Sequence, residues 1–152
     1  MKIVILSCFF VMLLSSNVFA SGVPDEVLKD IKAPIAARYP DNYSMQKTLI
    51  NNQIAAYGFL QTYSPSEVPG DVFQKIKQPI ESRYSSNYSM QKTLLQNQVS
   101  AYIFLQSYRP SGVPDEVLNR VKAKISARYP YNFSMQKTLI ENQVQSYLEL
   151  NG

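Results

Sequence analysis

The residues best suited to chemistry in this sequence are a serine, a lysine and a threonine that recur three times at the same spacing. They belong to a six-residue segment, 44–49, which is repeated letter for letter at 89–94 and again at 134–139. One turn inside a helix start, two hydroxyls, one ammonium and free backbone amides can converge on an anionic group. The sequence therefore predicts three equivalent anion- or partner-binding sites, formed by Ser44, Lys47, Thr48, Ser89, Lys92, Thr93, Ser134, Lys137 and Thr138.

The composition excludes most kinds of catalytic site. The chain has no histidine, and its single cysteine, Cys8, lies near the N-terminus. This leaves no Ser-His or Cys-His nucleophile pair and none of the usual zinc ligands. Carboxylate pairs at Asp25, Glu26, Asp115 and Glu116 remain as acid-base candidates, but these residues equally suit the positive end of a helix dipole. We expect a protein without enzymatic activity, metal or cofactor.

Residues 1–20 have the pattern of a secretory signal. Lys2 supplies a positive charge, an uncharged and largely apolar run follows at 3–14, and Ala20 precedes a cleavage point at Ser21. A membrane-spanning helix needs about 20 apolar residues, more than this run provides. Removal of the segment also removes the cysteine, so the mature chain has no disulfide. We expect a secreted or periplasmic protein that does not span a membrane after the signal is removed.

The rest of the chain consists of three units with the same pattern. They cover 21–65, 66–110 and, in a shortened form, 111–152, and they align without gaps. Self-similarity with a period of about 20 to 50 residues is typical of solenoid arrays, in which each unit stacks on the next. One such unit is too small to bury an adequate core alone, so the three should stack into one domain.

The repeated segment is also compatible with chance identity or with a packing role. Of the 42 positions that the three units share, 19 hold the same residue in every unit, so a match at three chosen positions is weak support for a site. Contact with a neighbouring helix also accounts for unchanged residues. Exposed side chains at Lys47, Lys92 and Lys137 favour a binding site, whereas lysines held against an adjacent helix indicate a scaffold.

Each unit has the pattern of two helices joined by a short turn. In the first unit, a proline and two acidic residues start a helix over about 24–38, and Tyr39 before Pro40 ends it. Asn42 is a preferred helix cap, so a second helix is expected from there to about Thr62. Strand patterns are absent from the sequence. We therefore predict an all-α fold of three tandem 45-residue αα-hairpin repeats, stacked as a short solenoid or six-helix array.

The second helix should bury one apolar stripe, formed by Met45, Leu49, Ala56 and Leu60. Gln53 falls in the middle of that stripe, and its counterparts are Gln98 and Gln143. Because buried amides need partners, we expect these glutamines to bond to a loop or a neighbouring helix and fix the stacking register. A ligand-binding cleft is the alternative role.

The joints between units are expected at two phenylalanines. Phe59 should contact unit two and Phe104 should contact unit three, whereas the third unit has Glu149 at the same position. A polar residue there suits the last unit of an array, because no further unit stacks on it.

The charge balance is mild. Lys and Arg total 15 against 11 Asp and Glu, a net charge of +4 without a basic cluster, which does not fit a nucleic-acid binder. We therefore expect an exported, non-enzymatic helical-repeat protein that binds a partner macromolecule, an unknown protein or a cell-envelope polymer, through a repeated surface. The alternative is an anion- or sugar-binding or processing protein that acts on cell-envelope polymers.

Overall fold

The computed structural model describes residues 22–151, which form six α-helices and no strand. The segment 1–20, interpreted from sequence as a secretory signal, lies outside the described residues. The helices are α1 (Asp25–Arg38), α2 (Tyr43–Thr62), α3 (Gly70–Arg83), α4 (Tyr88–Ser107), α5 (Asp115–Arg128) and α6 (Phe133–Asn151). The second helix of each unit therefore begins 45 residues after the second helix of the preceding unit. The predicted all-α fold is confirmed.

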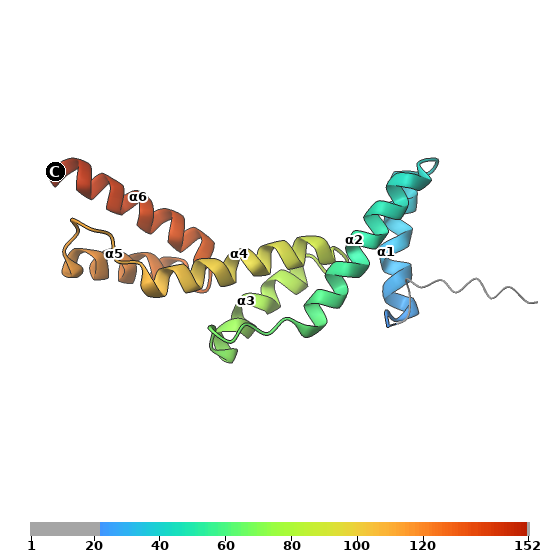
Figure 1. The fold of residues 1–152 in the computed structure, drawn as a ribbon, viewed down its shortest axis with the longest axis horizontal. Coiled ribbons are helices and arrows are strands. Elements are labelled where there is room, and N and C mark those ends of the chain that lie inside the picture. Colours follow the sequence, from blue (N-terminus) through green and yellow to red (C-terminus); the bar gives the residue numbers. More distant parts are fainter. Residues whose placement is uncertain (1–21, 152) are drawn as a thin grey trace, which may run out of the picture.

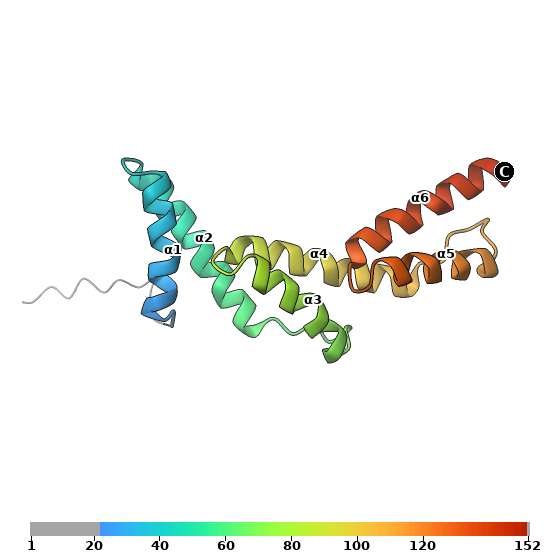
Figure 2. The same cartoon turned by 180° about the vertical axis from the view of Figure 1, so that it is seen from behind.

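The helices form three hairpins arranged in a row. Within residues 22–151, each first helix packs lengthwise only along the second helix of its own unit, whereas α2 packs on α4 and α4 packs on α6. The result is an elongated, gently bowed molecule with unit one at one end and unit three at the other (Figures 1 and 2). The first helices of successive units are thus separated from one another, which leaves space between them along the row.

Short-range hydrogen bonds explain where each second helix begins. The side chain of Asn42 accepts a hydrogen bond from the backbone amide of Met45 at 3.0 Å, and the same cap recurs in the other two units. The side-chain amide of Gln46 donates to the carbonyl of Tyr39 at 2.6 Å and so closes the turn between the two helices, again in all three units. The asparagine caps predicted from sequence are confirmed.

The core lies at the joints between units. One cluster combines the end of α2 with α3 and α4 and contains Leu60, Val68, Phe73, Ile76, Leu95 and Val99. A second combines the end of α4 with α5 and α6 and contains Leu105, Leu118, Ile140 and Val144. Each hairpin thus buries its apolar residues partly against the preceding one, which ties the three units together.

The expected single apolar stripe is only partly right. Ala56 and Leu60 are buried, but Met45 is 41% exposed and Leu49 is half-buried. The second helix lies between two neighbours and therefore has two buried faces. Along α4, for example, Leu95 and Val99 pack with α3 of the same unit and with the end of α2 of the preceding unit, whereas Leu105 at the end of α4 packs with the next unit.

Among the helices that the structure describes, none is both long enough and apolar enough to cross a membrane.

Candidate binding groove

The predicted triads lie in the first turns of the second helices, as expected, but their hydroxyl groups have local partners. The hydroxyl of Thr48 donates to the backbone carbonyl of Ser44 at 3.0 Å. Thr93 and Thr138 make the same bond at 2.9 Å and 3.1 Å. Such bonds from a threonine to the carbonyl one turn earlier are common in helices and satisfy the hydroxyl group locally.

The three lysines do not share one environment. Lys47 is exposed, whereas the ammonium of Lys92 lies 4.7 Å from the ring centre of Phe59 in the preceding unit. Lys137 lies 4.5 Å from the ring centre of Phe104 in the same way. The positions are therefore not equivalent, because a cation stacked on an aromatic ring already contributes to a joint in units two and three.

The backbone amides near the helix starts are also used in the joints. Ser89 donates its backbone amide to the side-chain oxygen of Gln53 at 3.1 Å, and the nitrogen of the same side chain donates to Asn87 at 3.1 Å. Gln98 makes the same pair of bonds to Asn132 and Ser134. The expected bonds to a neighbouring unit are confirmed for Gln53 and Gln98, whereas Gln143 is exposed. The backbone amides of Ser89 and Ser134 are therefore not free for an anion.

Aromatic contacts complete each joint. Phe59 packs into the cluster of unit two and Phe104 into that of unit three, as predicted. The rings of Tyr57 and Tyr88 meet edge to face with centroids 5.1 Å apart, and the corresponding pair in the second joint has a separation of 5.0 Å. Ser134, Lys137 and Thr138 also line a shallow pocket whose wall includes Glu141, a carboxylate that disfavours an anion there.

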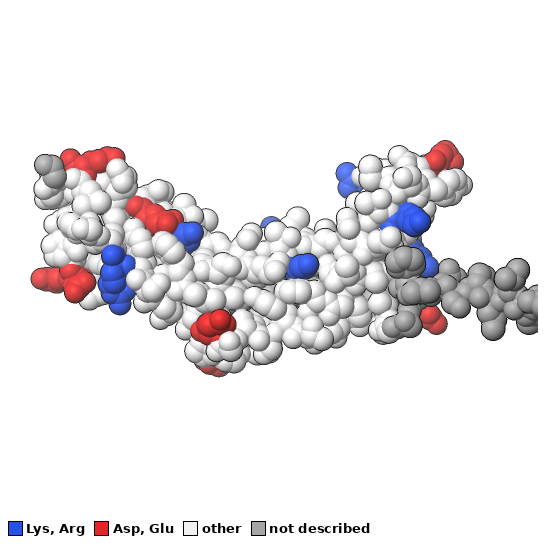
Figure 3. Space-filling view, viewed as in Figure 1, with Lys and Arg blue, Asp and Glu red and all other residues white. Residues whose placement is uncertain are grey.

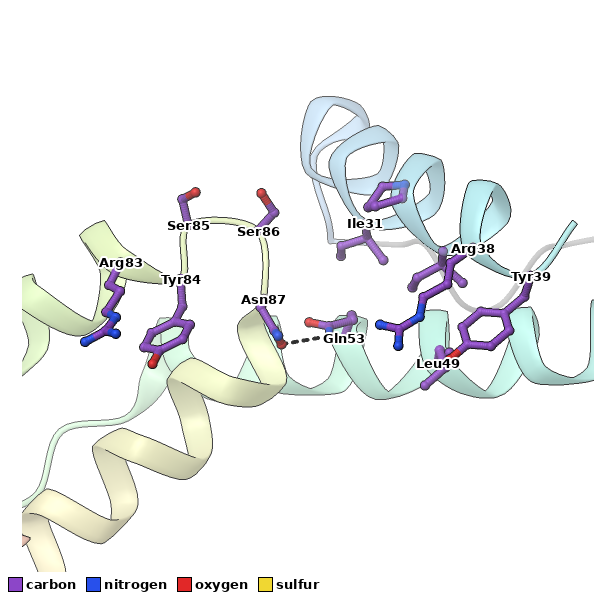
Figure 4. Close-up of a pocket in the computed structure, with 12 residues that line it drawn as sticks. Ile31, Arg38, Tyr39, Leu49, Gln53, Arg83, Tyr84, Ser85, Ser86 and Asn87 are labelled. Atoms are coloured by element: carbon purple, nitrogen blue, oxygen red, sulfur yellow. Dashed lines mark hydrogen bonds between the residues drawn. The ribbon is translucent and has the colours of Figure 1, made fainter.

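A different repeated feature is a groove between each first helix and the second helix of its unit. In unit one its volume is about 570 Å³, and the loop 84–87 of unit two forms one wall. Figure 4 shows Arg38, Tyr39 and Leu49 on one side of this groove, Arg83 and Tyr84 on the other, and the hydrogen bond between Gln53 and Asn87 between the two sides. In unit two the corresponding groove has a volume of about 490 Å³, and in unit three about 250 Å³.

Seven lining positions are shared by all three grooves. Two of them vary, with Ile31, Ile76 and Val121 at one and Pro34, Pro79 and Lys124 at the other. The other five hold the same residue in every unit: an isoleucine, an arginine, a tyrosine, a leucine and a glutamine. They are Ile35, Arg38, Tyr39, Leu49 and Gln53 in unit one, Ile80, Arg83, Tyr84, Leu94 and Gln98 in unit two, and Ile125, Arg128, Tyr129, Leu139 and Gln143 in unit three. The repetition in sequence therefore corresponds to a repeated surface in space.

Each groove combines a positively charged side chain with an apolar floor. The guanidinium of Arg38 is exposed and lies 5.6 Å from the ring centre of Tyr39, and the distances in the other units are 5.7 Å and 5.4 Å. Among the described residues that line the three grooves, none is acidic. A guanidinium in this setting can offer paired N–H donors to a carboxylate, sulfate or phosphate.

The second groove holds one further cation. Lys75 donates a hydrogen bond to the hydroxyl of Tyr131 at 2.8 Å, and this bond raises the pKa of the lysine. Tyr131 adopts a left-handed backbone conformation with φ of 59°, which is rare for an aromatic residue. Lys75 and Tyr131 both line the second groove, so this hydrogen bond joins a lysine of unit two to the loop of unit three.

The arginines were not among the residues that the sequence pattern singled out. Their recurrence beside a tyrosine in all three units is a usable signal. However, a cation in the last turn of a helix also complements the helix dipole, so the pair has an ordinary cause in sequence. Only the structure shows that the arginine lies beside a leucine and a glutamine from the other helix.

Within residues 22–151, no group of three or more Cys, His, Asp or Glu side chains is arranged to hold a metal ion. The acid-base candidates Asp25, Glu26, Asp115 and Glu116 line none of the three grooves. Figure 3 shows charged residues scattered over one face of the molecule, most of which is uncharged. Comparisons with models of protein families, with curated proteins and with solved structures found no match for this chain.

Proposed function

We propose that this protein is an exported, non-enzymatic binding protein whose repeated grooves hold an acidic partner macromolecule. The observation that supports this most is that sequence repetition coincides with a repeated surface. Five of the seven shared groove positions are identical in all three units, and each groove carries an exposed arginine without an acidic neighbour in its described lining. Export is inferred from the signal pattern at 1–20.

A polymer fits the grooves better than a small molecule does. Each groove is shallow, and an exposed arginine-anion contact contributes only modestly to affinity. Three grooves in a row can act together on one extended partner, because the second and third contacts form at a high effective concentration. The partner is therefore expected to carry negative charges at repeated positions along its length.

An acidic polypeptide segment is the first candidate. Its carboxylates match the guanidinium groups, and its apolar side chains match the floor formed by Ile35 and Leu49. An anionic cell-envelope polysaccharide is the second candidate, because the half-buried ring of Tyr39 beside the arginine can stack on a sugar. Sugar processing is not part of the proposal, since none of the described residues lining a groove is a carboxylate that could supply acid or base.

The test is a triple variant in which Arg38, Arg83 and Arg128 are changed to Gln. We expect binding to fall at least about tenfold, since three charge-assisted contacts are lost together. The matched control changes three exposed cations that line no groove, Lys29, Lys32 and Arg120, to Gln. Both variants lose the same charge, and both should keep the helical circular-dichroism signal.

Binding is measured by pull-down from cell-envelope extract, with the protein and polysaccharide fractions analysed separately. Capture that is lost in the arginine variant and kept in the control supports the grooves as the binding surface, and the fraction identifies the partner class. Equal capture by the arginine variant and the unchanged protein contradicts the proposal. Equal loss of capture in the arginine variant and the control variant indicates non-specific charge attraction and contradicts the proposal as well.

A further inference from the structure

The two ends of the array carry the two halves of the internal joint. In each joint, the end of one second helix meets the start of the next, as α2 meets α4 and α4 meets α6. The start of α2 and the end of α6 repeat these halves at the outer ends of the molecule, where no further unit is present among the described residues (Figure 1). We call these surfaces the head, at residues 42–54, and the tail, at residues 143–150.

The head exposes groups that the internal joints cover. Tyr43 is 74% exposed, whereas its counterparts Tyr88 and Phe133 are half-buried against a tyrosine of the preceding unit. Ile50 is half-buried, whereas Leu95 and Ile140 at the same position are almost completely covered. The head therefore presents an apolar surface with the same composition as the surface that receives a preceding unit inside the chain.

The tail exposes the matching half. Leu150 is 85% exposed, whereas Leu60 and Leu105 at the same position are buried in the core clusters. Gln143 is exposed, whereas Gln53 and Gln98 bond to the cap and the serine amide of the following unit. The tail also differs from the internal joints. Unit three has Glu149 where the other units have a phenylalanine, and none of the described residues corresponds to Tyr63 or Tyr108, which pair with that ring in the internal joints.

The acidic residue of the tail complements the head. In the internal joints the phenylalanine ring lies under the ammonium of Lys92 or Lys137. If the tail of one molecule meets the head of another in the same geometry, Glu149 takes the place of the ring and faces the exposed Lys47. A cation-aromatic contact is thus replaced by a pair of opposite charges, which favours association and orients it.

The third groove is also incomplete without a following unit. Loop residues of the next unit, 84–87 and 130–132, form one wall of the first and second grooves. The third groove is lined by residues of unit three alone and has the smallest volume, about 250 Å³. A second molecule on the tail supplies the missing wall with its own residues 40–42, which lie in the corresponding loop.

We propose that copies of this chain associate head to tail, with the end of α6 of one molecule packed on the start of α2 of the next. Such a contact joins two different surfaces, so it propagates into open chains where rotation does not close a ring. It gives Tyr43 and Lys47 of unit one a partner, although no unit precedes them among the described residues. Head-to-tail association also lengthens the row of grooves. The proposal rests on the exposed residues of the head and the tail and does not depend on what the grooves bind.

The first experiment blocks each end separately in the chain from residue 21 on, which retains all six helices. Tyr43→Asp blocks the head and Leu150→Asp blocks the tail, and both positions are highly exposed, so neither change disturbs the fold. In sedimentation velocity, the unchanged protein should grow beyond two copies with rising concentration, and each variant alone should remain a monomer. An equal mixture of the two variants should form dimers and nothing larger, because one working head and one working tail remain.

The second experiment reverses the end charges. Lys47→Glu or Glu149→Lys alone should weaken self-association about tenfold, because attraction becomes repulsion, and the two changes in one chain should restore it. The exposed Gln74 on α3, changed to Glu or to Lys, is the control for charge alone and should have no effect. Binding through the grooves of units one and two is left intact by the end variants, so failure here is distinct from failure of the proposed function.

Three results overturn the proposal. One is a protein that stays monomeric up to millimolar concentration. Another is self-association that either end variant leaves unchanged, which indicates a symmetric contact elsewhere. The last is a double charge variant that associates no better than the single variants.

Discussion

The starts of α2 and α4 have the same eight residues, 42–49 and 87–94, in different surroundings. The asparagine cap, the glutamine that closes the turn and the threonine bond to the helix backbone are the same in both. The tyrosine and the lysine are not: Tyr88 and Lys92 contact the preceding unit, whereas Tyr43 and Lys47 are exposed. Identical residues therefore have a local role in every unit and a joint role only where a unit precedes.

The contrast between joint and head can be tested first in the core. Leu95 is 1% exposed between units one and two, and Leu95→Ala should lower the free energy of unfolding by roughly 3 kcal/mol, the usual range for a buried leucine. Ile50→Ala removes a similar side chain from the same position in unit one, where it is only half-buried. In urea unfolding, Ile50→Ala should lower the free energy of unfolding clearly less than Leu95→Ala does. Equal losses in the two variants contradict the difference between head and joint.

The second prediction concerns the aromatic part of a joint. Phe104→Glu removes the ring under Lys137 and places a carboxylate beside the core of unit three, so we expect a loss of about 2 kcal/mol. The matched change Tyr43→Glu at the exposed head should alter stability little. Thermal unfolding of both variants decides the point, and an unchanged melting curve for the Phe104 variant argues against stacked units.

The third prediction separates a bonded glutamine from its unbonded counterpart. Gln98→Ala removes two hydrogen bonds to the start of α6 and should cost about 1 kcal/mol. Gln143→Ala, at the exposed tail, should cost close to nothing in a dilute, monomeric sample. Hydrogen exchange at the amide of Ser134 provides the local readout: it should accelerate in the first variant only.

Local rules predicted much of this fold. Helix starts at the prolines and asparagines, the six helices and the contacts of Phe59 and Phe104 follow from caps, periodicity and repetition. The prediction that Met45 is buried was wrong. A single helical wheel assumes one buried face, whereas α2, α4 and α6 each lie beside more than one helix. Sequence periodicity does not report how many neighbours a helix has.

The candidate site was harder to predict for a related reason. The triad at Ser44 lies within one helix, so its spacing is visible in the sequence. The groove combines Arg38 and Tyr39 from the end of one helix with Leu49 and Gln53 from the next, and its wall comes from the following unit. Only the packing angle of the hairpin and the stacking of the units bring these residues together. Identity among the three units identifies such residues, but it does not distinguish a residue that lines the groove from one that caps a helix.

The smallest expected effect is a pH dependence at the first joint. Burial at the joint, followed by the nearby Tyr57, raises the pKa of Tyr88 above its ordinary value. Below about pH 10 the phenol is protonated in both the folded and the unfolded chain, so it causes no pH dependence there. As the pH rises through that value, Tyr88 ionises first in the unfolded chain, and stability is lost until the pKa of the folded state is reached.

Tyr88→Phe should make the loss of stability above pH 10 shallower without removing it, since burial also raises the pKa values of Tyr63 and Tyr108. Urea unfolding at several alkaline pH values measures this slope, and Tyr43→Phe at the exposed head is the matched control. A slope that Tyr88→Phe leaves unchanged, or that Tyr43→Phe reduces equally, means that the joint does not distinguish the two tyrosines.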